Sequence, residues 1–270
     1  MNAFAWHWPV LNWAALDPVL LLLPLLAGVL VLMTHVPLGR RVLARGIIFL
    51  DLAVAQLAVL GVIIAHTLGW ETQGWQTQLA AASAALIGAA VLARCERRWP
   101  EIQEALIGST FVVAASVAVL LLSSDPHGGE HLSELLSGQI LWVTSAQIMQ
   151  IALLSTVLLG IWGILRERLG QLGFYLIFAL AITTSVQLVG VYLVFASLIL
   201  PALAVRRGCN VRAPLWGVVL GSVAYAAGLL VSALGDFPSG PCIVVALALM
   251  ALLTGNMWVI GKPRAVVRRA

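Results

Sequence analysis

Charged residues are scarce in this sequence of 270 residues. Asp, Glu, Lys and Arg together account for 10% of it, whereas hydrophobic residues account for 61%. Soluble globular domains carry about 25% charged residues, and disordered chains contain few apolar ones, so both classes are excluded. The apolar runs are continuous and do not alternate with polar residues, which argues against a β-barrel. The composition therefore predicts an all-α, polytopic membrane protein.

Cysteine is also rare, and the familiar motifs of ATP-hydrolysing and zinc-dependent enzymes are missing. Cys95 and Cys209 lie among arginines that we expect to face the cytoplasm, where thiols stay reduced. No Gly-x4-Gly-Lys-Ser/Thr motif occurs, so we do not expect this chain to hydrolyse ATP, and no His-Glu-x-x-His motif occurs either. The sequence therefore predicts a protein that is not an enzyme and holds no tightly bound cofactor.

All fifteen Lys and Arg residues fall in five short segments, and the connections between these segments contain none. The five segments are 40–45, 94–98, 166–168, 206–212 and 262–269. Positive residues mark the cytoplasmic loops of membrane proteins, so we expect all five segments on the inner side of the cytoplasmic membrane. The net charge of +4 is then explained by membrane insertion and is no evidence for nucleic-acid binding.

The alternation of these basic segments with uncharged or acidic connections predicts about nine transmembrane spans, with the N-terminus outside and the C-terminus inside. The predicted spans are 18–33, 46–65, 78–93, 105–122, 144–165, two passes within 170–205, 214–234 and 242–260. We expect residues 1–17 to form an outer interfacial segment, because tryptophan is dense there. Residues 18–260 are expected to form a single transmembrane domain, and residues 261–270 a cytoplasmic basic tail.

Three local patterns add detail to this outline. Residues 35–45 are expected to form a cytoplasmic loop that turns at Pro37 and contains His35. The span 78–93 is rich in alanine, so we expect a buried helix that packs closely against its neighbours. The segment 170–205 carries no charge at all and is too long for one span, so we place a reversal at 187–190.

One apolar span contains a carboxylate. Gly46–Ala65 is long enough to cross a bilayer core, and it holds Asp51, with Gln56 one and a half turns later. A carboxylate inside the hydrocarbon region costs roughly 2.5–3.5 kcal/mol or more, so Asp51 must face protein, water or an ion. One interpretation makes Asp51 a polar point on a solute path. The other makes it a structural carboxylate that accepts hydrogen bonds from polar residues at 183–187.

The longest polar connection predicted on the outer side is 123–139. It holds His127, Glu130, His131 and Glu134, and imidazole and carboxylate ligands suit zinc and similar divalent ions. A short helix over 131–139 would place Glu134 on the same face as His131. This group is interpreted either as a funnel for a released cation or as a solvated loop that faces a partner.

Two segments of the sequence resemble a known family. They are Val189–Arg207, with the sequence VGVYLVFASLILPALAVRR, and Ser232–Met250, with the sequence SALGDFPSGPCIVVALALM. Both resemble the permease subunits of ABC importers for zinc, manganese or iron. Those proteins share a glycine, an apolar stretch and a Leu-Pro-Ala or Ile-Pro-Ala element before basic residues, followed later by an Asp-x-Pro-x-Gly-Pro turn. The resemblance implies a homodimer, a pair of ATP-binding cassette subunits and an external metal-binding protein.

The sequence departs from the family pattern at two places. The family usually carries an acid and, four residues later, a histidine; here Gln56 stands at the histidine position and Asp51 one place before the acid. This implies weak transit contacts rather than a tight metal cage. The connection Arg166–Gly170 is also shorter than in the family, where it docks on the ATPase. The loops Arg94–Glu104 and Arg206–Pro214 are candidates to replace it.

These observations predict the transmembrane subunit of an ATP-driven importer of a divalent transition metal, with zinc as the expected ion. The ion would pass the outer histidines and then Asp51 and Gln56 at the axis of the dimer. Asp51, His127 and His131 are the predicted metal contacts. The predicted ATPase contacts are Arg97, Arg98, Arg166, Arg168, Arg206 and Arg207. A stand-alone proton- or cation-coupled transporter or channel that uses Asp51, and a non-transporting assembly subunit, remain alternatives.

Overall fold

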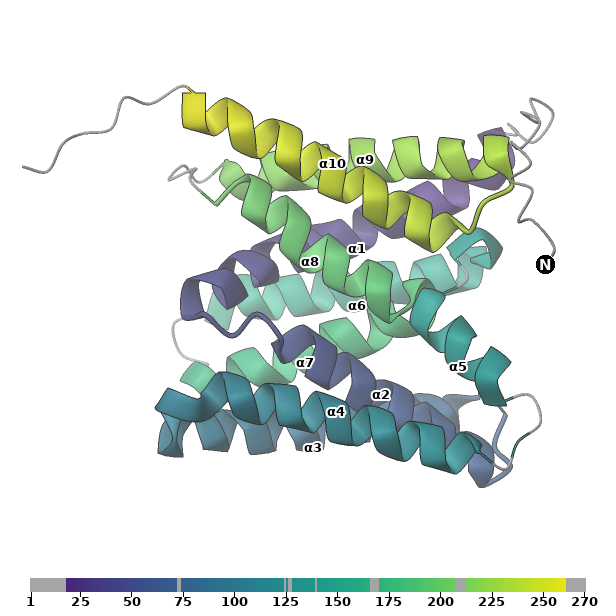
Figure 1. Cartoon of the computed structure of the whole chain (residues 1–270), viewed down its shortest axis with the longest axis vertical. Coiled ribbons are helices and arrows are strands. Elements are labelled where there is room, and N and C mark those ends of the chain that lie inside the picture. Colours follow the sequence, from purple (N-terminus) through teal and green to yellow (C-terminus); the bar gives the residue numbers. More distant parts are fainter. Residues whose placement is uncertain are drawn as a thin grey trace, which may run out of the picture.

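The computed structural model describes residues 18–71, 74–123, 125, 128–138, 140–165, 170–206 and 212–260. Every regular element in these ranges is helical, which confirms the all-α prediction (Figure 1). The elements are α1 (Pro18–Arg45), α2 (Leu50–Thr67), α3 (Trp75–Arg98), the 3-10 turn η2 (Pro100–Ile102), α4 (Gln103–Leu122), α5 (Gly128–Ser137), the 3-10 turn η3 (Ile140–Trp142), α6 (Ser145–Leu165), α7 (Gly170–Val189), α8 (Val191–Ala204), α9 (Ala213–Gly235) and α10 (Ser239–Ile260).

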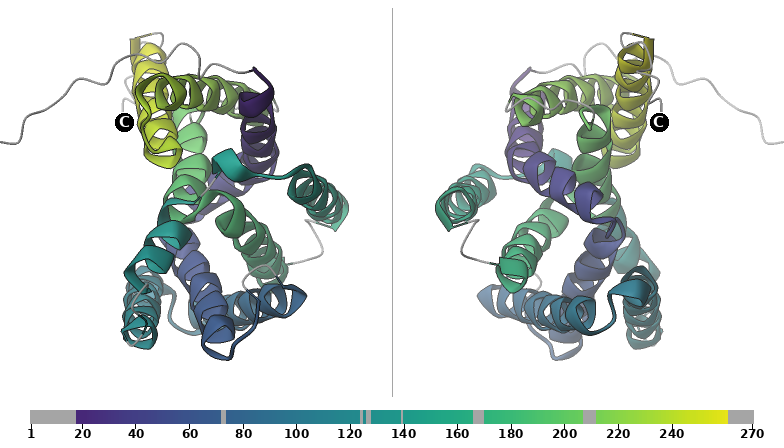
Figure 2. Two further views of the ribbon diagram at one scale, coloured as in Figure 1. Left: turned by 90° about the vertical axis from the view of Figure 1, so that its right-hand side faces the viewer. Right: turned by 90° about the vertical axis from the view of Figure 1, so that its left-hand side faces the viewer.

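The long helices form two groups that meet at α7 and α8. Helices α1, α8, α9 and α10 pack on one another, and α2, α3, α4 and α7 form the second group. Seen along the helices in Figure 2, the two groups occupy opposite ends of the long axis of the molecule. Helix α6 contacts α1 and α7 from the side, and the short α5 contacts α4, α7 and α8. Helices α2 and α7 are the most deeply buried of the candidate spans.

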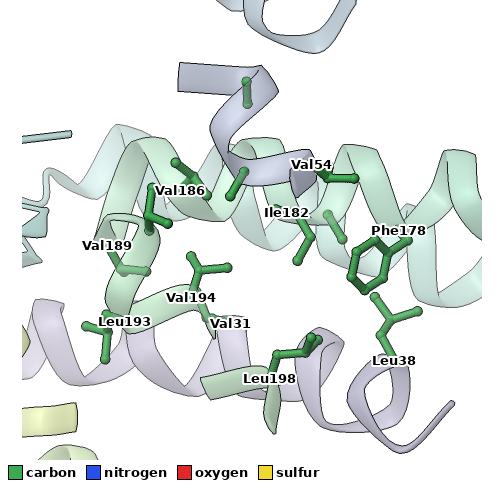
Figure 3. Packing of buried hydrophobic residues seen from close by; sticks show 14 of the residues in the cluster. Val31, Leu38, Val54, Phe178, Ile182, Val186, Val189, Leu193, Val194 and Leu198 are labelled. Atoms are coloured by element: carbon green, nitrogen blue, oxygen red, sulfur yellow. The ribbon is translucent and has the colours of Figure 1, made fainter. Parts of the chain in front are cut away.

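The hydrophobic core lies where α1, α2, α7 and α8 come together. Figure 3 shows Val31 of α1, Val54 of α2, Ile182 of α7 and Val194 of α8 converging there. All four side chains are buried. This packing places α2, the helix that carries the candidate carboxylate, in the middle of the bundle.

The basic residues of the described chain gather at one end of the bundle. The ends of α1, α3 and α8 and the starts of α4, α7 and α9 all lie on the left in Figure 1. We call this the inner end and the opposite one the outer end. Seven helices in the described ranges are long and apolar enough to cross a membrane, and Val191–Ala204 and residues 239–254 are shorter apolar helices. The polytopic membrane fold is thus confirmed, whereas the nine spans and their orientation stay predictions.

The prediction of a loop at residues 35–45 is wrong, because α1 continues as a helix to Arg45. The apolar face of the helix extends through this stretch, and Val36, Leu38 and Val42 are buried. Pro37 lies inside the helix, which neighbouring helices make tolerable in a membrane. The guanidinium of Arg45 lies over the Phe174 ring, 4.6 Å from its centroid, and fixes the end of α1 on α7.

The expectation of a buried alanine-rich helix holds for one face only. Ala81, Ala85 and Ala89 of α3 are buried, whereas Leu79 and Ile87 are exposed. The close approach to α2 depends on small residues, because a Cβ on Gly61 would lie 2.7 Å from the carbonyl oxygen of Ala80. Helix α3 therefore packs tightly on one side and leaves an apolar face at the surface of the bundle.

The predicted reversal at 187–190 is confirmed by the break between α7 and α8 at Gly190. Gly190 has a φ angle of 81°, and Gly138, after α5, has a φ angle of 71°. The two backbones touch, because a Cβ on either glycine would overlap backbone atoms of the other segment. A Cβ on Gly240, at the start of α10, would lie 2.7 Å from the Ser137 carbonyl oxygen. We call Gly138, Gly190 and Gly240 the glycine junction.

This junction unites the two segments that resemble the metal-importer permeases. Gly190 belongs to the first segment and Gly240 to the second, in the first turn of α10. The glycines therefore hold the ends of α5, α7 and α10 together at the outer end of the bundle, where even one methyl group has no space.

We expect Gly190→Ala to destabilise the folded protein. Its φ of 81° and ψ of 163° lie in a region that is essentially restricted to glycine, which costs about 1–3 kcal/mol for other residues. The clash with Gly138 adds to this cost. Measured by thermal unfolding in detergent, the variant should melt roughly 4–10 °C below the parent protein.

Gly108→Ala provides the matched control, because Gly108 lies within α4 and a Cβ there meets no atom within 4 Å. This variant should melt at or slightly above the parent temperature, since alanine favours helix. Equal melting temperatures for the two variants would contradict the glycine junction.

Candidate functional site

Asp51 lies at the start of α2 and not in the middle of a span. Gly46 ends α1 with a φ of 74°, and the Ile47 amide donates to the Val42 carbonyl over 3.3 Å. The chain then turns, and α2 begins only at Leu50. Asp51 is therefore in the first helical turn, near the inner end, where the partial positive charge of the helix start favours a carboxylate. The predicted span began four residues too early because it overlooked this turn.

The Asp51 carboxyl is fully buried and has no hydrogen-bond partner in the part of the chain that the structure describes. Both oxygens, Oδ1 and Oδ2, are without a partner. The hydroxyls expected to pair with it bond elsewhere: Thr183 donates to Ala179 at 2.8 Å and Thr184 to Leu180 at 2.9 Å, each within α7. Neither hydroxyl therefore supports the interpretation of Asp51 as a structural carboxylate that accepts hydrogen bonds from α7. A carboxyl left unpaired in this way can take up a proton or a cation.

Gln56 is also buried, with 2% of its surface exposed, against 0% for Asp51. Both side chains therefore lie inside a single chain. Neither side chain lies on the surface of the described chain, and the path along the axis of a dimer stays a prediction. Their burial follows from the packing of α2 among α3, α4 and α7.

His35 is a buried polar residue whose position the sequence did not predict, because the stretch around it was expected to be a loop. Its side chain is 0% exposed. Nδ1 lies 2.9 Å from the Val31 carbonyl, to which it donates if it carries the proton. Nε2 then has a free lone pair, and it is buried without a partner among the described residues. The signal in the sequence is the series of apolar residues at helical spacing that continues past His35, of which Val31, Leu38 and Val42 are buried in the structure.

The predicted outer funnel lies on and before α5. This helix starts at Gly128, three residues earlier than expected, and Glu130 and Glu134 are exposed one turn apart. Position 131 is within α5, but its side chain and all of His127 lie outside the described residues. Within the described ranges no three His, Cys, Asp or Glu side chains form a group that could hold a metal. The funnel stays a prediction.

The predicted ATPase contacts divide between described and undescribed segments. Arg97 and Arg98 form the exposed last turn of α3, and Arg206 is exposed after α8. The other three, Arg166, Arg168 and Arg207, lie outside the described residues. Helix α6 ends at Leu165 and α7 begins at Gly170, so their connection has at most four residues.

A groove of about 420 Å³ opens between α3, α6 and α7. Trp75, Gln78 and Thr184 are among its lining residues, and most of the lining is apolar. Among the described residues that line it, none carries a carboxylate, an imidazole or a thiol, and Asp51 does not belong to the lining.

Known proteins resemble this chain in sequence. A model of the ABC 3 transport family matches residues 19–170 and 163–258. A protein of Chlamydia pneumoniae described as a metal transport system membrane protein is 26% identical over 190 residues, which cover 61% of this chain. The matched region spans 65% of the length of that relative.

Two solved structures share the fold. PsaBC from Streptococcus pneumoniae, in complex with a Fab, has a TM-score of 0.72 at 18% identity, covering 90% of this chain and 95% of that one. An inward-facing metal-chelate type ABC transporter has a TM-score of 0.62 at 16% identity, covering 89% and 87%. Identities this low show the fold alone. The family model, however, matches nearly the whole sequence from residue 19 to residue 258, and this chain belongs to the ABC 3 transport family.

Proposed function

We propose that this chain is the transmembrane subunit of an importer that moves a divalent transition metal ion, with zinc as the foremost candidate, across the cytoplasmic membrane. A separate ATP-binding cassette subunit would hydrolyse ATP, an external metal-binding protein would deliver the ion, and two copies of the chain would assemble. Membership in the ABC 3 transport family supports the proposal. The names of the Chlamydia pneumoniae relative and of the inward-facing transporter, which both refer to metal, support the class of cargo.

The observation that carries the proposal is the unpaired, fully buried carboxyl of Asp51. A divalent cation that crosses a region of low dielectric constant needs a compensating negative charge. Asp51 supplies one near the inner end of the bundle, and Gln56 adds a neutral oxygen. Because both are buried, the ion reaches them only if α2 moves relative to its neighbours. The proposed transport cycle therefore includes an opening around α2.

The outer part of the proposed path consists of Glu130 and Glu134 on α5, together with His127 and His131. Glu130 and Glu134 are exposed and one turn apart, so they raise the local concentration of cations without forming a closed site. Zinc is the foremost ion because imidazole is among its preferred ligands.

A second candidate function is transport without an ATPase. The short connection between α6 and α7 favours it, because at most four residues leave little surface for a partner there. In that case Asp51 would carry a proton or a cation by itself. Flux through the isolated chain in vesicles that contain no ATPase distinguishes this alternative.

The proposed function is tested by isolating the native complex from membranes and measuring ATP hydrolysis with zinc, manganese and iron(II) in turn, each delivered by the external binding protein. We expect an ATPase subunit to co-purify, and one ion to stimulate hydrolysis. A lone chain that transports metal in response to a pH gradient would support the second candidate and contradict the first.

We expect Asp51→Asn to reduce metal uptake into vesicles at least tenfold while the protein stays folded. The change removes the charge but keeps the shape, and the removal of a costly buried ion should leave the melting temperature unchanged or raise it. Asp236→Asn is the control, because it makes the same chemical change at an exposed outer turn. Normal uptake by a stable Asp51→Asn protein would remove Asp51 from the path.

Loss of the outer ligands should affect capture and not the maximal rate. With His127→Ala and His131→Ala combined, or with Glu130→Gln and Glu134→Gln combined, the metal concentration for half-maximal uptake should rise several-fold. The effect of the glutamate pair should shrink at high salt, because exposed charges are screened. Complete loss of uptake in correctly inserted protein would show instead that these residues form an essential site.

A further inference from the structure

The turn between α3 and α4 is an ordered surface feature at the inner end of the bundle. It comprises Arg97–Glu104, which joins the last residues of α3 to the first residues of α4, and we call it the α3–α4 turn. The Trp99 amide donates to the Cys95 carbonyl over 2.7 Å, and Pro100–Ile102 forms the 3-10 turn η2. Trp99 is 47% exposed and Ile102 46% exposed, and Arg97, Arg98 and Glu101 are exposed beside them.

This combination of side chains is typical of a protein interface. Tryptophan and arginine are the residues that most often dominate binding energy, and they do so around a small apolar centre. The turn offers Trp99 and Ile102 as that centre, with arginines at its edge. An exposed tryptophan also anchors helices among lipid headgroups, so the surface chemistry alone does not decide between protein and lipid.

The links of the turn to the two central helices favour protein. The Phe49 amide, directly before α2, donates to Oε1 of Glu104 over 3.2 Å. Glu104 is in the first turn of α4, and Phe49 is two residues before Asp51. A displacement of the α3–α4 turn would therefore act on the start of the helix that carries the buried carboxyl.

A second set of hydrogen bonds joins the turn to α7. Arg97 donates from Nε to Oε1 of Gln171 over 3.2 Å. Gln103 is buried, and its Nε2 donates to the Tyr175 hydroxyl over 3.1 Å. The turn is thus bonded both to α2 and to α7, the two most buried candidate spans.

We propose that the α3–α4 turn is the main contact through which the ATPase subunit moves this permease. The proposal rests on the proposed function, and the partner is a cytoplasmic protein with an apolar pocket for Trp99 and acidic groups for Arg97 and Arg98. Trp99 and Ile102 dock, whereas Glu104 and Gln103 transmit the movement to α2 and α7. Only four positions of the sequence separate α6 from α7, so the α3–α4 turn offers a partner more side chains than that connection does.

The docking role is tested in the native complex, with the ATPase subunit retained on the affinity-purified permease as the readout. We expect Trp99→Ala combined with Ile102→Ser to reduce the retained ATPase at least tenfold, while the melting temperature of the permease is unchanged. Trp142→Ala is the matched control, because Trp142 is 79% exposed in the outer turn η3. This control should retain the ATPase fully.

A photo-reactive residue gives a direct readout that does not depend on affinity. Replacement of Trp99 by p-benzoylphenylalanine should crosslink the permease to the ATPase subunit, and replacement of Trp142 should not. Crosslinking of position 99 to lipid alone, with full retention of the ATPase by the double variant, would overturn the proposal and leave Trp99 as a lipid anchor.

The transmitting role is tested by Glu104→Gln, which weakens the bond to the Phe49 amide and leaves the docking residues in place. We expect this variant to retain the ATPase and to hydrolyse ATP, but to move at least threefold less metal per ATP. Unchanged coupling would overturn the transmitting role. If the parent protein itself binds no ATPase subunit, both the proposed function and this inference are overturned. If the parent and the double variant of Trp99 and Ile102 bind the ATPase subunit equally well, only this inference is overturned.

Discussion

The exclusion of unpaired polar groups from hydrocarbon is the constraint on which the rest of this structure depends. In a bilayer each backbone amide and carbonyl must find its partner within the protein, and only helices achieve this within a single segment. The hydroxyls of Thr183 and Ser197 follow the same constraint, because each donates to the carbonyl four residues earlier. Asp51 departs from this constraint with both of its carboxyl oxygens, and departures of this kind are expected where a membrane protein carries out its function.

Close packing of small residues determines which groups become buried. Lipid is as apolar as leucine, so membrane helices associate through van der Waals contact, which small residues improve. Gly61 lets α3 approach α2, and Gly190 lets the end of α5 lie against the break between α7 and α8. These contacts keep α2 and α7 in the middle of the bundle, and the burial of Asp51 is a consequence of that position.

Both ends of the bundle contain close backbone contacts. At the outer end the backbones at Gly138 and Gly190 touch, and near the inner end Gly39 of α1 lies directly against the Leu198 carbonyl of α8. The region around the α3–α4 turn is joined to its neighbours by side-chain hydrogen bonds, such as those of Arg97 and Gln103. Each such bond contributes about 0.5–1.5 kcal/mol, so it can break and reform without unfolding. A partner that contacts this region can therefore drive motion there at small cost.

The sequence alone determined the class of protein, the positions of most helices and the grouping of basic residues at one end. These properties follow from local composition. Apolar runs of sufficient length form helices in a membrane, and an arginine is excluded from the hydrocarbon whichever helices pack together. The break at Gly190 was predictable for the same reason, because an uncharged stretch that long cannot be one span. The composition of the outer connection likewise predicted a short helix, although α5 starts three residues earlier than expected.

Only the tertiary structure decided the course of α1 beyond Thr34, the burial of His35 and Asp51, and the meeting of Gly138 with Gly190. The residues at 35–45 contain proline, glycine and arginine, which are typical of a loop, and it is the packing of Val36 and Val42 into the core that keeps them helical. Asp51 was visible in the sequence, but its depth and its lack of a partner depend on α3, α4 and α7, which are distant in the chain. Burial and close approach are properties of pairs of segments, and a single sequence carries no direct record of which segments pair.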